Sequence, residues 1–252
     1  MIKYIEEMLI NADPSSNIVV DNGFLIRCYN TNNLCTINML VHEHGARYAD
    51  IIKSHIERLS KLSINPCYRI VHESSYQNLD LELVRNGFDV VERGAVMALR
   101  IENMERELFA FANFYEQGIM IDDVLTDEWI DDYRYMTGME KGHGDLFESN
   151  LKNSLEDKMF FVLLQKDRLI AMGYSTFSGE YMIVNDIFVD ERYRNLDYGK
   201  RLLKAMLIKG LLRGCKVALC EIREEQEHAL KMITQEGFER LYSYQYRGKS
   251  IF

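Results

Sequence analysis

Proline is scarce in this chain: Pro14 and Pro66 are the only two in 252 residues. Linkers rich in Ser and Gly and low-complexity runs are missing as well, so domain boundaries must be inferred from the pattern of predicted elements. No stretch approaches the ~20 apolar residues that span a bilayer. The N-terminal stretch MIKYIEEMLINADPSS carries acidic residues and lacks the basic start of a secretory signal. We therefore expect a soluble protein without such a signal.

Paired cysteine motifs are also missing. The five cysteines include no CxxC pair, and their odd number leaves at least one thiol unpaired: Cys28, Cys35, Cys67, Cys215 and Cys220. Reduced, buried cysteines in a cytoplasmic protein fit this pattern best. Neither His143 nor His228 has a second ligand at metal-binding spacing, so we expect no metal site.

Positive charge is in deficit, with 30 Lys and Arg against 39 Asp and Glu and a formal net charge of −9. Nucleic acids and anionic membranes are bound largely by clustered Lys and Arg, so we expect neither partner. The acidic balance suits a cationic or amine-bearing substrate, although simple solubility is the commoner reason for such a charge. The hydrophobic share of 47% and charged share of 27% are typical of an ordinary globular protein.

A faint internal repeat at an offset of about 150 residues organises the chain. Each copy is predicted to run helix, strand, helix, Gly-Phe, strand, and the glycine is expected to cap the helix before an apolar residue starts the strand. Chance similarity of two α/β segments is the alternative. The elements are expected at 49–64, 67–71, 81–88 and 93–101 in the first copy, and at 199–214, 216–222, 230–238 and 240–248 in the second.

Further elements are predicted only in the second half. Thr126 can cap a helix in TDEWIDDYRYMTG, and GDLFESNLKNSL predicts a second helix. Residues 159–189 predict three antiparallel strands joined by the turns QKDR and SGE. The second half is therefore expected to be a complete β-α-α-β-β-β-α-β-α-β unit from about Ile119 to Phe252, and the first half a shorter one.

The segment IFVDERYRNLDYGKRLL, Ile187 to Leu203, combines an apolar strand, a polar loop and a basic amphipathic helix. Gly199 lies in the first turn of that helix, and a helix N-terminus of this kind is suited to bind anions. Asp197 lies within the loop, where its carboxylate would repel a phosphate. The segment therefore raises the question of whether it binds a phosphorylated ligand.

The order of elements and the spacing from Val189 through Arg194 to Gly199 resemble the GCN5-related N-acetyltransferase (GNAT) superfamily over roughly the C-terminal 135 residues. The family signature Q/R-x-x-G-x-G/A reads RNLDYG here, with Asp197 in place of the first glycine. The first half resembles the N-terminal half of bacterial tandem GNAT proteins. Its HGARYA stretch at 44–49 lacks the arginine and the closing glycine at the matching positions.

This resemblance implies an α+β fold, the GNAT acyl-CoA N-acyltransferase fold, with a mixed, mostly antiparallel central sheet flanked by helices and two GNAT-like units in tandem. The expected domains are a degenerate N-terminal domain at 1–104, a connecting segment at 105–118 and a catalytic domain at 119–252. It implies an enzyme that transfers an acetyl group from acetyl-CoA to a primary amine of a small molecule or peptide, by direct attack in a ternary complex. The chain is expected to be a monomer with an internal pseudo-dimer, or a homodimer.

The resemblance also implies where acetyl-CoA binds. Its pantetheine arm would pair with backbone groups of the fourth strand where the fourth and fifth strands splay apart, at Ile187, Phe188 and Val189. Its pyrophosphate would bind backbone N–H groups at Asn195, Leu196, Asp197, Tyr198, Gly199 and Lys200. Arg194 would contact the phosphates or brace the loop, and the charge of Lys200 would serve either the phosphates or solvent. Gln226 stands where the family often has an asparagine that bonds the arm.

Two catalytic candidates follow from the same resemblance. NDIFV is similar to the E-D-φ-φ-V pattern of diamine and spermidine-type acetyltransferases, with Asn185 in place of the glutamate. Asp186 is therefore expected to recognise the acceptor amine or to act as a base through water, unless it pairs with a neighbouring cation. Ile233 stands where many family members have a tyrosine that acts as the general acid for the leaving thiolate. Tyr244 is the candidate acid instead, although Tyr242, Tyr244 and Tyr246 share one face of the last strand and packing is the commoner role of such a pattern.

The departures at Asn185, Asp197 and Ile233 support a rival interpretation from another class of function. In that interpretation the chain is a non-catalytic acetyl-CoA sensor or interaction protein with a degenerate site. The sequence favours the enzyme, because the groups that bind pyrophosphate are backbone N–H groups and survive a change of side chain.

Overall fold

The computed structural model describes residues 1–13, 15, 17–29, 34–41, 47–110 and 112–251. The chain forms two compact units, each assembled from separate stretches. Unit 1 contains Met1–Pro14, Met97–Glu221 and Glu227–Glu239, and unit 2 contains Ser15–Val96, Ile222–Gln226 and Arg240–Phe252. The first helix thus belongs to the same unit as most of the C-terminal half. The predicted domains were continuous segments, and their boundaries stay a prediction.

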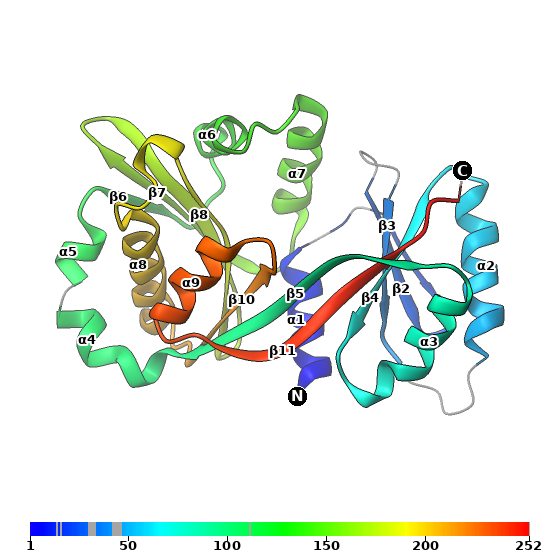
Figure 1. Ribbon diagram of the computed structural model, residues 1–252. Coiled ribbons are helices and arrows are strands. Elements are labelled where there is room, and N and C mark those ends of the chain that lie inside the picture. The colour runs from blue at the N-terminus through cyan, green and yellow to red at the C-terminus, as the bar shows by residue number, and fades with distance from the viewer. Residues whose placement is uncertain (14, 16, 30–33, 42–46, 111, 252) are drawn as a thin grey trace. The chain divides into compact units, whose positions relative to one another are not determined.

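Unit 1 contains a sheet in the order β10-β9-β8-β7-β6, with helices around it (Figure 1). The pairs β6–β7, β7–β8 and β8–β9 are antiparallel and β9–β10 is parallel, which confirms the mixed, mostly antiparallel sheet. The strands are β6 (Ile119–Asp122), β7 (Asp157–Gln165), β8 (Arg168–Ser178), β9 (Tyr181–Val189) and β10 (Val217–Arg223). The helices are α1 (Ile2–Ala12), α4 (Glu105–Ala110), α5 (Ala112–Glu116), α6 (Asp127–Thr137), α7 (Lys141–Asn153), α8 (Tyr198–Leu212) and α9 (Glu227–Gln235).

Helix α8 is the central helix of unit 1. It packs on β8 and β9, and α4 and α5 lie against it on the side away from those strands (Figure 1). Because it is covered on both sides, its apolar residues are almost fully buried: Leu202, Leu203, Ala205, Met206, Leu207 and Ile208. A second cluster, formed by α6, α7 and the strands, contains Trp129, Ile130, Tyr133, Leu151, Phe160, Met172 and Tyr174.

Local signals in the sequence set the ends of several helices. The hydroxyl of Thr126 accepts a hydrogen bond from the backbone N–H of Trp129 at 3.1 Å, which confirms the predicted cap of α6. Gly87 and Gly237 both have a positive φ, 76° and 90°, which a helix-ending glycine adopts without strain. The phenylalanine after each glycine is 2% exposed, so both predicted Gly-Phe caps are confirmed.

Unit 2 contains a sheet in the order β1-β2-β3-β4-β11, and β5 passes from this unit into unit 1 after Val96. Its strands are β1 (Asn17–Asp21), β2 (Phe24–Tyr29), β3 (Leu34–Met39), β4 (Asn65–Val71), β5 (Asp89–Arg100) and β11 (Glu239–Gly248), and its helices are α2 (Tyr48–Ser60) and α3 (Gln77–Arg85). The four elements predicted for each copy of the repeat are thus present. The HGARYA stretch falls partly on residues 42–46, which lie outside the described residues.

A buried histidine fixes α2 to the sheet of unit 2. His55 is 0% exposed, and its Nδ1 lies 2.7 Å from the hydroxyl of Tyr68 on β4. Burial lowers the pKa of His55 to about 4, although the nearby carboxylate of Asp21 opposes this shift. The imidazole is therefore neutral at physiological pH.

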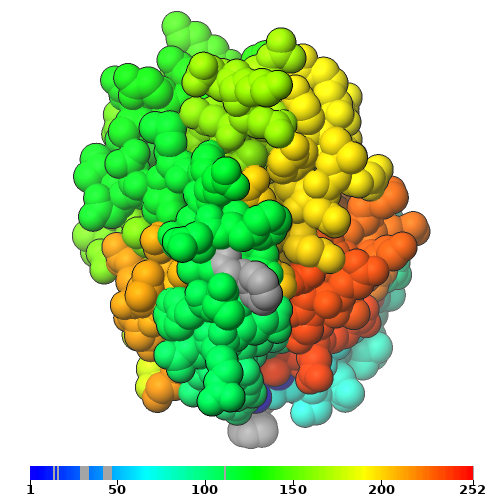
Figure 2. Space-filling view, turned by 90° about the vertical axis from the view of Figure 1, so that its left-hand side faces the viewer, coloured from blue at the N-terminus to red at the C-terminus, as the bar shows by residue number. Residues whose placement is uncertain are grey.

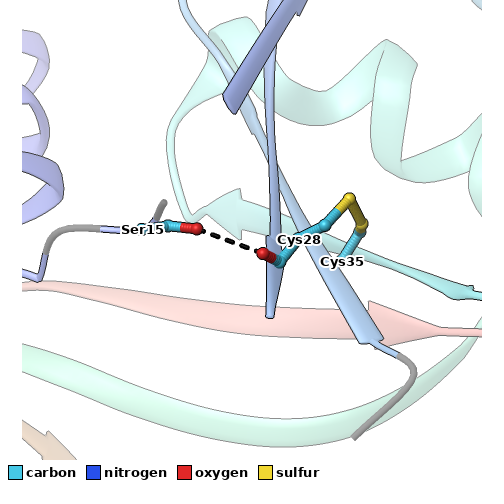
Figure 3. The surroundings of a disulfide bond; sticks show 3 residues. All are labelled: Ser15, Cys28 and Cys35. Carbon is cyan, nitrogen blue, oxygen red and sulfur yellow. Dashed lines mark hydrogen bonds between the residues drawn. A yellow bond between two sulfur atoms is a disulfide. The ribbon is translucent and has the colours of Figure 1, made fainter. Parts of the chain in front are cut away.

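The expectation that every cysteine is reduced is wrong. Cys28 on β2 and Cys35 on β3 face each other in the antiparallel register and form a disulfide, with their Cα atoms 4.1 Å apart (Figure 3). The carbonyl of Cys28 also accepts a hydrogen bond from the Ser15 hydroxyl at 3.2 Å. The two cysteines are seven residues apart in the sequence and come together only through the register of β2 with β3. The sequence alone does not give that register, so it could not reveal the bond. The other three cysteines are free and buried, and burial raises the pKa of each thiol.

Candidate active site

Strand β9 loses its parallel neighbour partway along its length. It pairs with β10 only from Tyr181 to Ile183, where the last pair joins Ile183 to Leu219. The parallel register thus ends partway along β9, and Ile187, Phe188 and Val189 lie beyond it. This early end is in keeping with the splaying of the two strands that the resemblance implies. An extended ligand could add to this edge as a strand would.

A bulge interrupts β9 on its other side. The register with β8 shifts between Met172 and Tyr174, so that Asp186 and Ile187 together lie opposite Gly173. Asp186 has a φ of 45°, and its side chain is exposed. A Cβ atom on Gly173 would lie 2.9 Å from the carbonyl oxygen of Asp186 and 2.8 Å from the terminal methyl of Met206. Only glycine fits opposite this bulge, which turns Asp186 outward.

Tyr133 on α6 holds the carboxylate of Asp186. Its hydroxyl donates a hydrogen bond of 2.9 Å to Oδ2 of Asp186. The Tyr133 side chain is 4% exposed, and burial and the negative charge of Asp186 raise the pKa of its hydroxyl far above the usual value. Sequence analysis missed this residue. The only available signal was the i,i+4 spacing of Trp129 and Tyr133, which places both rings on one face of a helix.

The loop that follows β9 is braced by its own charged side chains. The backbone N–H of Arg192 donates to Asp190 at 2.9 Å, and the Arg192 guanidinium hydrogen bonds lower the pKa of Asp190 to about 2. Nε of Arg194 donates to the carbonyl of Val189 at 3.4 Å, and its Nη1 lies 3.2 Å from Glu191. These contacts hold Arg194 against the loop, and its role toward the phosphates stays a prediction.

The N-terminus of α8 presents backbone donors. Asp197 is the N-cap residue, and its carbonyl accepts from the N–H of Arg201 at 2.9 Å. Its side chain makes no capping hydrogen bond, and its φ of 59° is unusual for a residue with a side chain. The first N–H groups of a helix have no partner within the helix. Those of Tyr198, Gly199 and Lys200 are therefore suited to bind an anion.

Gly199 allows α8 to approach β9 closely. A Cβ atom there would lie 3.2 Å from the sulfur of Met232 and 3.3 Å from a methyl of Val189. Tyr198 on the same turn donates from its hydroxyl to Oε1 of Gln165 at 3.0 Å. The loop with Asn195 and the exposed Leu196 leads into this turn. The yellow segment of Figure 2, which contains this loop, lies at the surface beside the orange-red segment that contains α9.

Lys200 forms an ion pair with the buried carboxylate of Glu236. Its Nζ lies 3.1 Å from a carboxylate oxygen of Glu236, whose other oxygen lies 3.2 Å from Nζ of Lys204. Lys204 also lies 3.1 Å from Glu107 on α4. Glu236 is 7% exposed, so two cations offset its buried charge. This ion-pair network makes Lys200 a brace for the first turn of α8.

Two of the predicted site residues belong to unit 2. Oε1 of Gln226 accepts a hydrogen bond from the backbone N–H of Arg223 at 3.1 Å. Tyr244 on β11 is 3% exposed, and the guanidinium of Arg69 lies 3.9 Å from its ring centroid. The structure thus brings Asp186, the part of β9 beyond its parallel register and the α8 N-terminus together within unit 1. The roles of Gln226 and Tyr244 stay predictions.

Two further sequence expectations can be compared with the part of the chain that the structure describes. No group of three or more His, Cys, Asp or Glu side chains there could hold a metal ion. None of the helices there is long and apolar enough to cross a membrane.

Comparison with known proteins gives a consistent picture. Residues 123–238 match the sequence model of the acetyltransferase (GNAT) family. No protein of curated function matches the chain in sequence. The fold is similar to a GCN5-related N-acetyltransferase from Kribbella flavida, with a TM-score of 0.69, 13% identity, and coverage of 98% of this chain and 95% of that one.

Two other solved structures are similar over most of the chain. A tandem GNAT protein from the clavulanic acid biosynthesis pathway has a TM-score of 0.66 and 12% identity, with 92% of this chain and 81% of that chain covered. A functionally unknown conserved protein from Staphylococcus epidermidis has a TM-score of 0.67 and 11% identity, with 99% of both chains covered. At such identities the likeness shows the fold, while the match at 123–238 carries the family. Residues 123–238 therefore match the GNAT acetyltransferase family, and the chain as a whole has the GNAT fold, similar to that of a tandem GNAT protein.

Proposed function

We propose that this chain transfers the acetyl group of acetyl-CoA to a primary amine of a small molecule or peptide, by direct attack in a ternary complex. One observation carries the proposal. β9 continues beyond the end of its parallel register with β10, carries the bulged Asp186 there, and is followed by the loop that leads to the α8 N-terminus. This part of β9 therefore offers a backbone edge between a carboxylate and a set of anion-binding donors.

The residues present suit acetyl-CoA as the co-substrate. The backbone of Ile187, Phe188 and Val189 would pair with the amide groups of the pantetheine arm. The N–H groups from Asn195 to Lys200 would bind the pyrophosphate at the positive end of the α8 dipole. Asp197 is the one acidic residue between Asn195 and Lys200, and its charge would weaken binding. The network that holds Lys200 would keep the first turn in place.

Asp186 would act on the acceptor. The amine reaches the enzyme as an ammonium ion and must lose a proton before its nitrogen can attack the thioester carbonyl. Asp186 would bind the ammonium ion and take that proton directly or through a water molecule. The C–N bond then forms, the nitrogen releases its second proton to solvent, the C–S bond breaks, and the leaving thiolate takes a proton. Tyr244 is the proposed donor of that proton, with water as the alternative.

A non-catalytic acetyl-CoA sensor is the second candidate. In place of the glutamate expected from related enzymes, Asn185 donates from Nδ2 to Thr176 Oγ1 at 3.0 Å, so it acts here as a structural residue. Ile233 is 3% exposed and provides no proton. A sensor would keep the β9 edge and the α8 donors and would have no need of the bulge at Asp186. The precise placement of Asp186 therefore favours the enzyme.

The compartment and the oligomeric state stay predictions. The cytoplasmic location was inferred in part from reduced cysteines, and the Cys28–Cys35 disulfide removes that support.

Thermal melting with acetyl-CoA, followed by measurement of thiol release, tests the proposal. Saturation at a hundred times the dissociation constant should stabilise the fold by about 2.7 kcal/mol and raise Tm. Thiol release should then depend on one or more amines from a panel of small amines, amino acids, aminoglycosides and peptide N-termini. A shift in Tm without amine-dependent release would favour the sensor. No shift at millimolar acetyl-CoA would exclude both candidates.

A further inference from the structure

We propose that Tyr133 is a positioning residue for amine acetylation, which aims the Asp186 carboxylate at a cationic acceptor. This inference rests on the proposed function, because it assigns Asp186 a role in turnover. It concerns unit 1 alone, to which both residues belong.

The ring of Tyr133 is held on both faces. It stacks on Trp129 at 5.0 Å between ring centroids with an interplanar angle of 21°, and on Phe147 from α7 at 4.5 Å and 11°. Its edge meets Phe188 of β9 at 5.5 Å and 85°. Aromatic rings in such contacts have little freedom to move. The hydroxyl of Tyr133 is therefore presented at one fixed place, toward the bulge of β9.

The partner of this hydroxyl is unusual for a buried phenol. A backbone carbonyl would satisfy a buried O–H group as well, but Tyr133 donates instead to an exposed carboxylate at 2.9 Å. The backbone of Asp186 has a φ of 45°, which the bulge opposite Gly173 imposes. The bulge sets the direction of the side chain, and the hydrogen bond selects its rotamer. The bulge and the hydrogen bond from Tyr133 thus fix the position of the Asp186 carboxylate together.

The charge around this carboxylate indicates the class of acceptor. The negative charges of Asp186 and of Asp13, at the end of α1, both raise the pKa of Tyr133 and of Tyr174, although burial is the larger cause for each. Tyr133 therefore remains protonated and continues to donate. The exposed Asp186 carboxylate beside the buried ring of Tyr133 favours a cation, which suits the ammonium form of the acceptor amine in the proposed function. During turnover the proton leaves the amine for Asp186 or a water molecule, and Tyr133 keeps its own.

A double-mutant cycle tests this role. Tyr133→Phe removes one oxygen atom and keeps the stacked ring, and Asp186→Asn removes the charge with little change in shape. We expect Tyr133→Phe to lower kcat about 10-fold, since hydrogen bonds to charged groups are of that strength. Asp186→Asn should lower kcat about 100-fold, and the double variant should equal Asp186→Asn alone. The KM for acetyl-CoA should stay unchanged throughout.

Two controls separate positioning from structural support. Tyr135→Phe alters an exposed tyrosine of the same helix and should leave kcat unchanged. Asp186→Glu keeps the whole aromatic stack and moves the carboxylate by one methylene. It should lower kcat, and adding Tyr133→Phe to it should have little further effect. Melting curves, followed by the fluorescence of Trp129, show whether each variant is folded.

The outcomes distinguish the two proposals. Non-additive losses in kcat with an unchanged KM for acetyl-CoA support the role of Tyr133. An active wild type in which the two losses multiply, or in which Tyr133→Phe has full activity, would overturn that role and leave the proposed function standing. A wild type that releases no thiol with any amine would overturn both.

Discussion

Units 1 and 2 each contain a strand that runs parallel to the strand after the next helix, and the two pairs differ in length. In unit 2, β3 and β4 pair over five consecutive positions, from Leu34–Asn65 to Asn38–Arg69, which is nearly all of β3. In unit 1, β9 and β10 pair over three positions, although β9 has nine residues. Of these two parallel pairs, β9–β10 is thus the one whose register ends well before the end of the strand, which leaves room beside β9 for an extended ligand.

The preceding hairpins differ in the same way. β2 and β3 pair without interruption from Phe24–Met39 to Tyr29–Leu34, whereas the register of β8 with β9 shifts at Gly173. Both copies of the repeat keep the order of helix, strand, helix, Gly-Phe and strand, although β11 of the second copy belongs to unit 2. The order of elements can thus persist without the bulge on which the proposed chemistry depends. We infer that the first copy is a scaffold, in line with the degenerate copy expected from the sequence.

The largest predicted effect concerns unit 2, where the buried His55 of α2 contacts Tyr68 of the sheet. The pKa of His55 is about 4 in the folded state, below its unfolded value of about 6.5. As the pH falls through 6.5, the unfolded state takes up a proton first, so stability is lost between pH 6.5 and about 4. The loss should amount to about 3 kcal/mol. Urea unfolding across this range measures it.

His55→Gln should remove this loss, whereas His228→Gln, an exposed histidine on α9, should leave it in place. Trp129 is the only tryptophan and lies in unit 1, so its fluorescence reports on that unit alone. If the free energy of unfolding falls at low pH when it is measured by circular dichroism but not when it is measured by Trp129 fluorescence, unit 2 unfolds separately. Equal pH dependence in wild type and His55→Gln would contradict the prediction.

The second prediction concerns the bulge of β9 opposite Gly173. Gly173→Ala places a methyl group against the carbonyl of Asp186, so the bulge must shift and carry the carboxylate with it. A misplacement of about 1 Å can lower kcat by about 100-fold. The free energy of unfolding should fall by about 1–3 kcal/mol. Thiol release and urea unfolding measure the two effects.

Gly142→Ala is the matched control, since a Cβ atom there meets nothing within 4 Å and the residue lies in α7 of the same unit. It should be as active as the wild type. Full activity in Gly173→Ala would mean that the bulge is not part of the active site.

Much of the fold could be predicted because it depends on short-range signals. Periodicity located α8 and the strands that flank it, Thr126 marked the start of α6, and the Gly-Phe pairs marked two helix ends. The spacing of Arg194 and Gly199 located the loop between β9 and α8. Each of these features is encoded within a few neighbouring residues.

The site itself depends on long-range register. The bulge arises because Gly173 and Asp186 meet across two strands, and Tyr133 reaches Asp186 from 53 residues away. The Cys28–Cys35 bond likewise depends on a hairpin register. A single sequence contains no local signal for such pairings.

The smallest predicted effect sharpens the comparison at the α8 N-terminus, where Asp197→Gly should strengthen acetyl-CoA binding. Glycine adopts the φ of 59° without strain, and the change removes a negative charge beside the proposed pyrophosphate site. A charge at a helix end contributes about 1 kcal/mol, so the dissociation constant should fall roughly 5-fold. Calorimetric titration measures this change.

Two control variants separate charge from backbone strain. Asp197→Asn removes the charge alone and should give most of the gain in affinity. Asn195→Gly relieves a φ of 60° in the same loop without altering charge, so it should leave affinity unchanged. Unchanged or weaker binding in Asp197→Gly would show that this carboxylate does not oppose the phosphate.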